Sequence, residues 1–382
     1  MATCLPLVHH ITGLADPRGK RGRRYPLAAM LSLAVAATLC GAQGYCAMAE
    51  WGRSQGAELA RSLGFTRART PCAATFCLLL RRLDRQALEA CLGQWVAQVL
   101  AALPPAKAGG PPGLAIDGKT LRGSRKQGAP LTHILSAVSH RLGLTLGQVA
   151  VDDKTNEITA IHTLLEGLLL AGQVVTLDAL LTQRKIAQAL VDAGADYIMV
   201  VKENQPALHE ALATAFADPA LLAAHPRSRA RSLDRGHGRL ERRVITLSSA
   251  LADYLDWPGQ QQAFQLVRSR TNRKTGAVQA ETIYGLTSLS AAKADATYVL
   301  ARVRNHWIIE NGSHYVRDVT FHEDHSQVRA GSTPQVLAAL RNVAIALHRL
   351  HGETNMASAC RRTAAKPRRA LKLLGIDLKK TK

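Results

Sequence analysis

The stretch Gly113-Leu-Ala-Ile-Asp-Gly-Lys-Thr-Leu121 determines how this sequence folds, because an apolar run in it leads directly into a carboxylate. The same pattern returns further along the chain in Val174-Val-Thr-Leu-Asp178. Short apolar runs bounded by turn residues are typical of buried strands. A buried carboxylate without a partner costs several kcal/mol, so a strand that runs into an aspartate indicates a site. If the two strands are neighbours, Asp117 and Asp178 meet at one point of a sheet.

The segments between and after these two runs supply the other elements of an α/β fold. Alternating apolar residues predict strands, and apolar residues at three- and four-residue spacing predict helices. Strands are predicted at 113–121, 134–138, 144–151, 174–177 and 197–201, and helices at 158–170 and 182–191. The resulting order, β-β-β-α-β-α-β, predicts a ribonuclease-H-like mixed sheet with helices on its faces.

The residues on both sides of this core indicate further parts of the chain. Residues 1–103 show helical spacing throughout and are expected to form an N-terminal helical domain. Pro-Pro and Gly-Gly pairs in 104–112 indicate a linker. The α/β domain is then expected to span 113–350, and 351–382 to form a basic C-terminal tail.

A β-rich insertion is expected inside the α/β domain, at about 206–303. It is predicted to begin with a helix over 207–224 and a basic loop over 227–243. Strands are predicted at 243–247, 263–268, 280–286 and 298–303, and helices follow at 306–315 and 334–350.

The charge of the chain is strongly one-sided. Its 49 Lys and Arg against 28 Asp and Glu give a net charge of +21. Such a surplus favours a polyanionic partner, because each neutralised phosphate releases counterions. DNA, RNA and an anionic membrane surface all meet this requirement. Aromatic residues make up only 4% of the chain, which argues against single-strand binding by base stacking.

Two features bear on the compartment of the protein. Seven cysteines without a C-x-x-C pair indicate neither a zinc ribbon nor a disulfide framework, which favours reduced thiols in a cytosolic protein. The uncharged run 27–49 follows Arg21, Arg23 and Arg24, as a membrane span with a positive flank would. Its many small residues favour a buried helix instead, so a soluble protein without membrane association is expected.

The two aspartates are suited to binding hard cations. Mg²⁺ is held by one or two carboxylates together with oxygens of a phosphate substrate. Two such ions about 4 Å apart can activate an attacking oxygen and stabilise a leaving one. Taken singly, Asp178 could cap the following helix and Asp117 could begin a turn at Gly118. The pair in its strand context favours the metal site.

A longer motif points to a family. The stretch His306-Trp-Ile-Ile-Glu-Asn-Gly-Ser-His-Tyr-Val-Arg-Asp-Val-Thr-Phe-His-Glu-Asp324 resembles the C-terminal signature of bacterial insertion-sequence transposases of the H-repeat-associated type. The resemblance extends over about 12–350. The other segments that carry it are Gly22-Arg-Arg-Tyr-Pro26, Ala115-Ile-Asp-Gly-Lys119, Asp178-Ala-Leu-Leu-Thr-Gln183, Lys202-Glu-Asn-Gln205 and Arg235-Gly-His-Gly-Arg239.

This resemblance implies a DDE transposase, whose ribonuclease-H-like fold carries two Asp and one Glu as catalytic and metal-binding residues. Asp117 and Asp178 match the first two, and Glu310 matches the third. Glu323 stays the alternative third carboxylate. Related transposases often have Tyr and Arg seven and four residues before the Glu, where this chain has Val303 and His306.

The resemblance also implies cofactors and partners. Mg²⁺ is the expected cofactor, and Mn²⁺ is expected to substitute for it. Double-stranded DNA is the expected partner, both as terminal repeats of the element, for which residues 1–103 are the candidate reader, and as target. A homo-oligomer on DNA is expected, in the bacterial cytoplasm and associated with the nucleoid. The candidate DNA-binding residues are Lys119, Arg122, Arg125, Lys126, Arg235, His237, Arg239 and Arg317, with Arg242 and Arg243 beside the second cluster.

Three functions remain open from the sequence. The first is a transposase that hydrolyses a phosphodiester at the element end and then directs a 3′-OH against target DNA. The second is a catalytically silent, transposon-derived DNA-binding protein. The third is a ribonuclease-H-like nuclease without strand transfer. The three carboxylates favour an enzyme, and the insertion and basic tail favour transposition.

Overall fold

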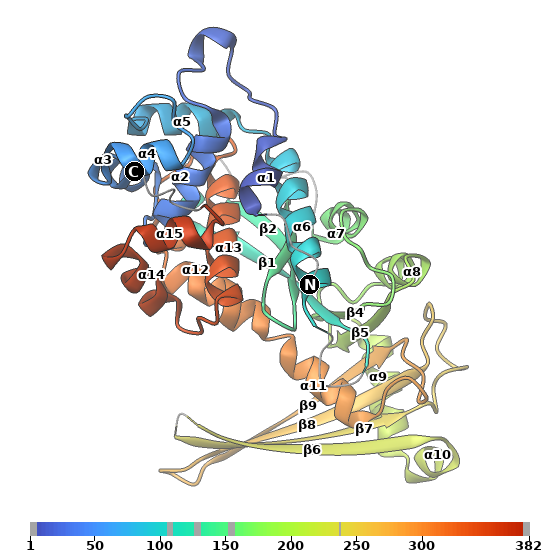
Figure 1. The fold of residues 1–382 in the computed structure, drawn as a ribbon. Helices are drawn as coiled ribbons and strands as arrows, with labels where there is room; N and C mark the ends of the chain where they lie inside the picture. Colours follow the sequence, from blue (N-terminus) through green and yellow to red (C-terminus); the bar gives the residue numbers. More distant parts are fainter. Residues whose placement is uncertain (1–5, 105–109, 126–130, 152–156, 237, 377–382) are drawn as a thin grey trace. The chain divides into compact units, whose positions relative to one another are not determined.

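The computed structural model of this chain describes residues 6–104, 110–125, 131–151, 157–236 and 238–376. They form two compact units, each assembled from separate segments of the chain (Figure 1). Unit 1 contains Met1–Pro105, Gly118–Leu168 and Ile308–Lys382, and unit 2 contains Ala106–Asp117 and Leu169–Trp307. Strand β1 (Gly113–Leu121) therefore begins in unit 2 and ends in unit 1.

Unit 2 is built on a mixed sheet with the strand order β1-β4-β5-β9-β8-β7-β6. Its parallel part consists of the first half of β1, β4 (Val174–Leu177) and β5 (Asp196–Val201). Helix α8 (Arg184–Asp192) connects β4 to β5. Parallel neighbours need such a crossover, because the chain must return to the same end of the sheet. All four residues of β4 are buried, as expected for a strand with neighbours on both sides.

The antiparallel part of this sheet lies within 206–303, where the sequence predicts a β-rich insertion. Strand β9 pairs with β5, and β8, β7 and β6 follow it in turn, which leaves β6 at the edge (Figure 1). Helix α11 packs against β6 and β7 and shares a core with Ile245, Leu247 and Phe264. The bounds of these elements are α9 Pro206–Ala217, α10 Pro219–Ala224, β6 Arg227–Gly236, β7 Arg239–Ser248, β8 Gln262–Asn272, β9 Val278–Thr287 and α11 Ala296–Asn305.

Three predictions for the insertion were wrong, each for a local reason. Residues 227–243 form the hairpin of β6 and β7 rather than a basic loop, because exposed and half-buried residues alternate along β6 as on a strand with one face in water. Residues 298–303 lie in α11 rather than in a strand, because Asp295 caps a helix there by accepting the Tyr298 N–H at 2.8 Å. The helix predicted over 207–224 is two helices, since Asp218 caps α10.

Unit 1 surrounds α2 (Leu27–Leu39), in which every residue except Ala28 is buried. The helix contacts α1, α3, α13, α14 and α15 and ends before Gly41, whose φ of 90° suits glycine. Among the described residues, no helix combines the length and the apolar character needed to cross a membrane. The other helices here are α1 Leu7–Thr12, α3 Tyr45–Ser54, α4 Gly56–Ser62, α5 Ala73–Arg82, α6 Arg85–Ala102, α7 Glu157–Glu166, α12 Tyr315–Val319, α13 Thr333–Leu350, α14 Met356–Ala365 and α15 Arg368–Leu373.

The remaining strands of unit 1 are β2 (Thr132–Ser139) and β3 (Thr145–Val151), which pair antiparallel. The element order β-β-β-α-β-α-β predicted for residues 113–201 is therefore observed. The region expected to be a basic tail differs, because α14 and α15 contribute Met356, Cys360 and Leu371 to the core. Most of the predicted linker, residues 105–109, lies outside the described residues.

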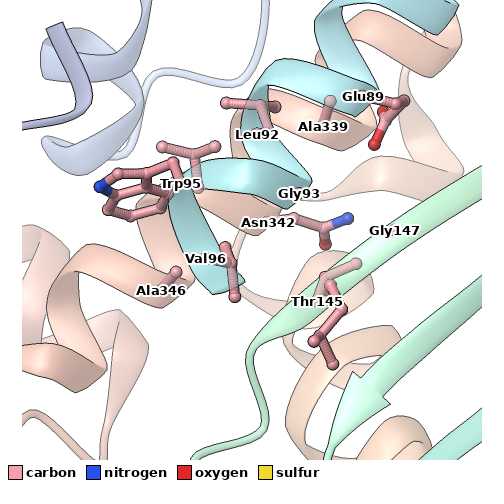
Figure 2. Close-up of a pocket in the computed structure, with 12 residues that line it drawn as sticks. Glu89, Leu92, Gly93, Trp95, Val96, Thr145, Gly147, Ala339, Asn342 and Ala346 are labelled. Atoms are coloured by element: carbon pink, nitrogen blue, oxygen red, sulfur yellow. The ribbon is translucent and has the colours of Figure 1, made fainter. Parts of the chain in front are cut away.

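A small cavity of about 10 Å³ lies between α6, β3 and α13 (Figure 2), which is room for about one water molecule. Glu89 at its rim accepts a hydrogen bond from Gln148 Nε2 at 2.7 Å, and Asn342 Nδ2 donates to Gln148 Oε1 at 3.0 Å. Burial raises the pKa of Glu89 to about 8, against the opposing effects of Gln148 and Arg317. At neutral pH its carboxyl is therefore mostly protonated.

This raised pKa predicts a pH-dependent stability. Between pH 4.5 and about 8 the unfolded chain loses the Glu89 proton while the folded chain keeps it, so the free energy of unfolding falls as pH rises through this window. Glu89→Gln is expected to remove this contribution. The free energy of unfolding, measured with urea across this pH window, is expected to fall with pH in wild type but not in the variant. The same pH dependence of the free energy of unfolding in both proteins would show that Glu89 ionises normally in the folded protein.

Candidate active site

Asp117 and Asp178 lie at equivalent positions of neighbouring parallel strands in unit 2. The register pairs Ile116 of β1 with Leu177, the last residue of β4, so Asp117 continues β1 and Asp178 directly follows β4. Neighbouring strands run about 4.8 Å apart, which brings the two side chains to the same edge of the sheet. Both aspartates are half-buried.

Hydrogen bonds hold the loop that follows β4 in position. Asp178 Oδ1 accepts the Leu181 N–H at 3.1 Å, and the Thr182 hydroxyl lies 2.6 Å from the Val200 carbonyl oxygen of β5. From the next loop, Asn204 Nδ2 donates to the Ala179 carbonyl at 2.8 Å and Gln205 Nε2 donates to the Thr182 carbonyl at 3.0 Å. The motifs at 178–183 and 202–205 thus hold each other and fix the backbone of Asp178.

A cleft of about 520 Å³ opens beside Asp178 within unit 2. It lies where β4 and β5 end and the longer β9 continues, and its lining includes Lys202, Asn204, His209 and Glu281. Open α/β sheets bind ligands outside the carboxyl ends of their strands. Asp178 therefore faces a space that a substrate can enter.

His306 follows α11 and belongs to the same neighbourhood. Its Nδ1 lies 2.9 Å from the Thr176 hydroxyl, two residues before Asp178. Burial lowers the pKa of His306 to about 4, so the imidazole is neutral at physiological pH. It cannot supply the positive charge that arginine gives to related transposases at this position. The sequence marked His306 only as a departure from the family pattern.

Glu310 lies in unit 1, on the π-helix Ile309–His314 between α11 and α12. Single π-turns are rare and are frequently found at functional sites. Glu310 is exposed, and one of its carboxylate oxygens lies within 4.8 Å of a ring nitrogen of the buried His314. Burial, reinforced by the charges of Arg317 and Lys119, lowers the pKa of His314 to about 3. The neutral imidazole is the form that binds metals.

Sequence reasoning missed His314 as a candidate ligand. The available signal was its position four residues after Glu310. That spacing brings two side chains to the same side of a helix.

A buried ion cluster in unit 1 contains the two remaining candidates of this motif. Glu323 lies 2.6 Å from Arg317 and 2.7 Å from Arg341, and the exposed fraction of each of the three residues is 3% or less. Burial alone would raise the pKa of Glu323, but the two arginines outweigh it and hold the pKa below its ordinary value. This geometry favours a structural role for Glu323, whereas Glu310 is exposed. It also gives the Arg317 guanidinium no access to a phosphate.

The other predicted DNA-binding residues are distributed over both units. Lys119 is buried and lies 2.7 Å from Asp318, whereas the side chain of Arg122 is 80% exposed. Arg125 is exposed as well. Arg235 and Arg239 are exposed on the β6–β7 hairpin of unit 2. Lys126 and His237 lie outside the described residues.

Comparisons with known proteins point to one family. A family model described as "Transposase DDE domain" matches residues 108–347, and one described as "DDE_Tnp_1-associated" matches residues 8–96. The chain is 29% identical over 352 residues to "Putative transposase YncI" of Escherichia coli O157:H7, which covers 90% of this chain and 87% of that protein. It is also 29% identical over 350 residues to "H repeat-associated putative transposase YhhI" of Escherichia coli K12, covering 89% of each.

Two further similarities are informative to different degrees. An uncharacterized protein from the dhlA 3′ region of Xanthobacter autotrophicus is 34% identical over 254 residues, covering 64% of this chain and 82% of that protein. The match to a piggyBac transposase in a synaptic complex with hairpin DNA has a TM-score of 0.40 and 12% identity and covers 97% of this chain and 78% of that chain. The match over residues 108–347 spans most of the chain, which therefore belongs to the family of transposases with a DDE domain.

Proposed function

We propose that this transposase-family protein cleaves DNA strands at the ends of an insertion sequence and transfers them to target DNA, with Asp117, Asp178 and Glu310 as its catalytic carboxylates. The observation that carries the proposal is the register of β1 and β4, which brings Asp117 and Asp178 to one edge of the sheet beside an open cleft. Two carboxylates so arranged, in a chain that matches a transposase DDE domain, favour phosphodiester chemistry over simple DNA binding.

The proposal includes a ribonuclease-H-like fold for the catalytic domain. Its support is the element order β-β-β-α-β-α-β together with the parallel pairing of β1, β4 and β5. The antiparallel pair of β2 and β3 has the place in the order that this fold requires.

The donor set fits a hard divalent cation. Asp117 and Asp178 offer carboxylate oxygens, and Glu310 would complete the site, with His314 as a neutral nitrogen ligand beside it. Mg²⁺ is the proposed cofactor, with Mn²⁺ as a substitute. When bound, such ions activate the attacking oxygen and stabilise the leaving oxygen. The protein's own part is to hold Asp178 in place through Leu181, Thr182 and Asn204.

Double-stranded DNA is the proposed partner, both as the element's terminal repeats and as target. The net charge of +21 and the exposed Arg122 and Arg125 support it. The N-terminal helices of residues 1–103 are proposed to recognise the ends, and the protein to act as a homo-oligomer on DNA in the nucleoid.

The test is strand cleavage of duplexes taken from the DNA that flanks the coding sequence. Wild type is expected to nick these duplexes at the element boundary with Mg²⁺ or Mn²⁺ and to leave them intact in EDTA. A Mg²⁺-dependent joining of the new 3′-OH to a second duplex would establish strand transfer. Binding to the boundary duplexes without any cleavage would favour the catalytically silent DNA-binding protein.

A further inference from the structure

Strand β6 presents a row of arginines on one side. Every second residue from 227 to 235 lies on this side, and four of these five are exposed arginines: Arg227, Arg229, Arg231 and Arg235. Leu233 is the fifth. The residues between them are Ser228, Ala230, Ser232 and Asp234. Residues two apart on a strand point to the same side. The row runs over the nine residues Arg227–Arg235, which corresponds to about 27 Å.

The row continues onto the next strand. Leu233 of β6 pairs with Arg242 of β7, so the exposed Arg242 points to the same side as the row. We call the side of β6–β9 that carries these five arginines the arginine face. Its other positions on β7, β8 and β9 are small, polar or aliphatic, apart from Tyr284, and none is acidic.

All the acidic residues of these four strands lie on the opposite side. Asp234 is 2.6 Å from Arg243 and 2.9 Å from Arg304, Glu241 is 2.8 Å from Arg243, and Glu281 pairs with Arg268. Helix α11 covers this opposite side and packs on its apolar half. By contrast, none of the five arginines of the arginine face forms an ion pair with another described residue. The positive charge is thus neutralised on one side of the sheet and left uncompensated on the other.

We infer that the arginine face binds the sugar-phosphate backbone of duplex DNA without reading its sequence, as a contact separate from the carboxylate site. The inference rests on the proposed function in so far as DNA is the substrate. Guanidinium groups bind phosphates bidentately, and contacts to phosphate position a duplex without specifying bases. Over about 27 Å of helix axis one DNA strand presents about eight phosphates, so the length of the row suits a duplex.

Two alternative roles fit the arginine face less well. Single-stranded DNA is bound largely by stacking on aromatic side chains, but the one aromatic residue of this face, Tyr284, already packs against His209 and Phe216 of α9. Charged residues on an edge strand also discourage pairing with other sheets. That role does not require Arg242, which lies on the second strand from the edge.

The test is the affinity of the full-length protein for a mixed-sequence duplex in EDTA, measured by fluorescence anisotropy over a range of salt concentrations. EDTA removes any contribution of a metal at the carboxylates. Each lost phosphate contact reduces the slope of log K against log salt by about 0.9, so Arg229→Gln/Arg231→Gln is expected to reduce it by about 2. At about 0.1 M salt the variant should bind one to two orders of magnitude more weakly.

Matched variants separate the possible outcomes. Arg184→Gln/Lys185→Gln removes the same charge from exposed positions of α8 in the same unit and is expected to keep the wild-type slope. Arg229→Lys/Arg231→Lys should keep most of the affinity, because the charges remain. An unchanged slope for the Arg229→Gln/Arg231→Gln variant would overturn the inference. A loss of affinity only for duplexes with the sequence of the element's ends would also overturn it, because the arginine face would then bind DNA in a sequence-specific way.

The two proposals can fail independently. If wild type never cleaves DNA but Arg229→Gln/Arg231→Gln still reduces the slope of log K against log salt, DNA binding by the arginine face is supported and the catalytic proposal is refuted.

Discussion

Replacing Asp178 by alanine is expected to abolish metal-dependent cleavage, with a loss in rate of at least about a thousandfold. The carboxylate faces the cleft and is the residue that the loops after β4 and β5 hold in position. Without it, a cation at the sheet edge loses one of its few protein ligands. Single-turnover cleavage of an element-end duplex in Mg²⁺ measures the effect.

The control for this substitution is Asp192→Ala, at an exposed position of α8 in the same unit, which should cleave as wild type does. Asp178→Asn keeps the size of the side chain and removes its charge, and the same loss is expected. Both Asp178 variants should still bind the duplex in EDTA. Cleavage by Asp178→Ala at the wild-type rate would contradict the proposed mechanism.

Substitutions of Glu310 and Glu323 are expected to have opposite effects on stability and activity. Glu323→Ala leaves Arg317 and Arg341 buried without their partner, which should lower the free energy of unfolding by about 3–5 kcal/mol. Glu310 is exposed, so Glu310→Ala should change stability by no more than about 0.5 kcal/mol. Its expected effect is loss of cleavage.

Urea unfolding and cleavage, measured on the same preparations, distinguish these two roles. Cleavage by Glu323→Ala is measured at low temperature, where the fraction of folded protein can be checked by circular dichroism. The assignment is reversed if Glu310→Ala still cleaves while a folded, stable Glu323→Ala does not.

The part of the fold that positions the aspartates was predictable from the sequence. The apolar runs before Asp117 and Asp178 are short, unbroken and bounded by turn residues, so local pattern alone indicates their strands. The element order followed from the alternation of such runs with helical spacing. The pairing of Ile116 with Leu177, by contrast, is a long-range contact that the order favours but does not fix.

Two of the predictions failed because one local signal concealed another. The arginines of 227–243 indicated an exposed loop, although their alternation with small residues already had the period of a strand. Aromatic and β-branched residues in 298–303 indicated a strand, although Asp295 before them is a helix cap. In both segments the composition favoured one structure and the spacing favoured the one observed.

The distinction between Glu310 and Glu323 was not available from sequence. Both lie in one motif, and only packing against Arg341, 18 residues further on, shows that Glu323 is neutralised inside the protein. The same holds for the arginine face. Which arginines of the hairpin share a side depends on a register that only the paired strands reveal.

The proposal that these carboxylates bind the divalent ions on which cleavage depends is tested most directly by Mn²⁺ binding followed by electron paramagnetic resonance. The titration is made with an element-end duplex present, so that the phosphate ligands are supplied. We expect wild type to take up Mn²⁺ in parallel with the onset of cleavage, and Asp117→Asn/Asp178→Asn to bind the duplex but no such Mn²⁺. Equal Mn²⁺ uptake by wild type and this variant would show that the metal is held elsewhere and would refute the proposed site.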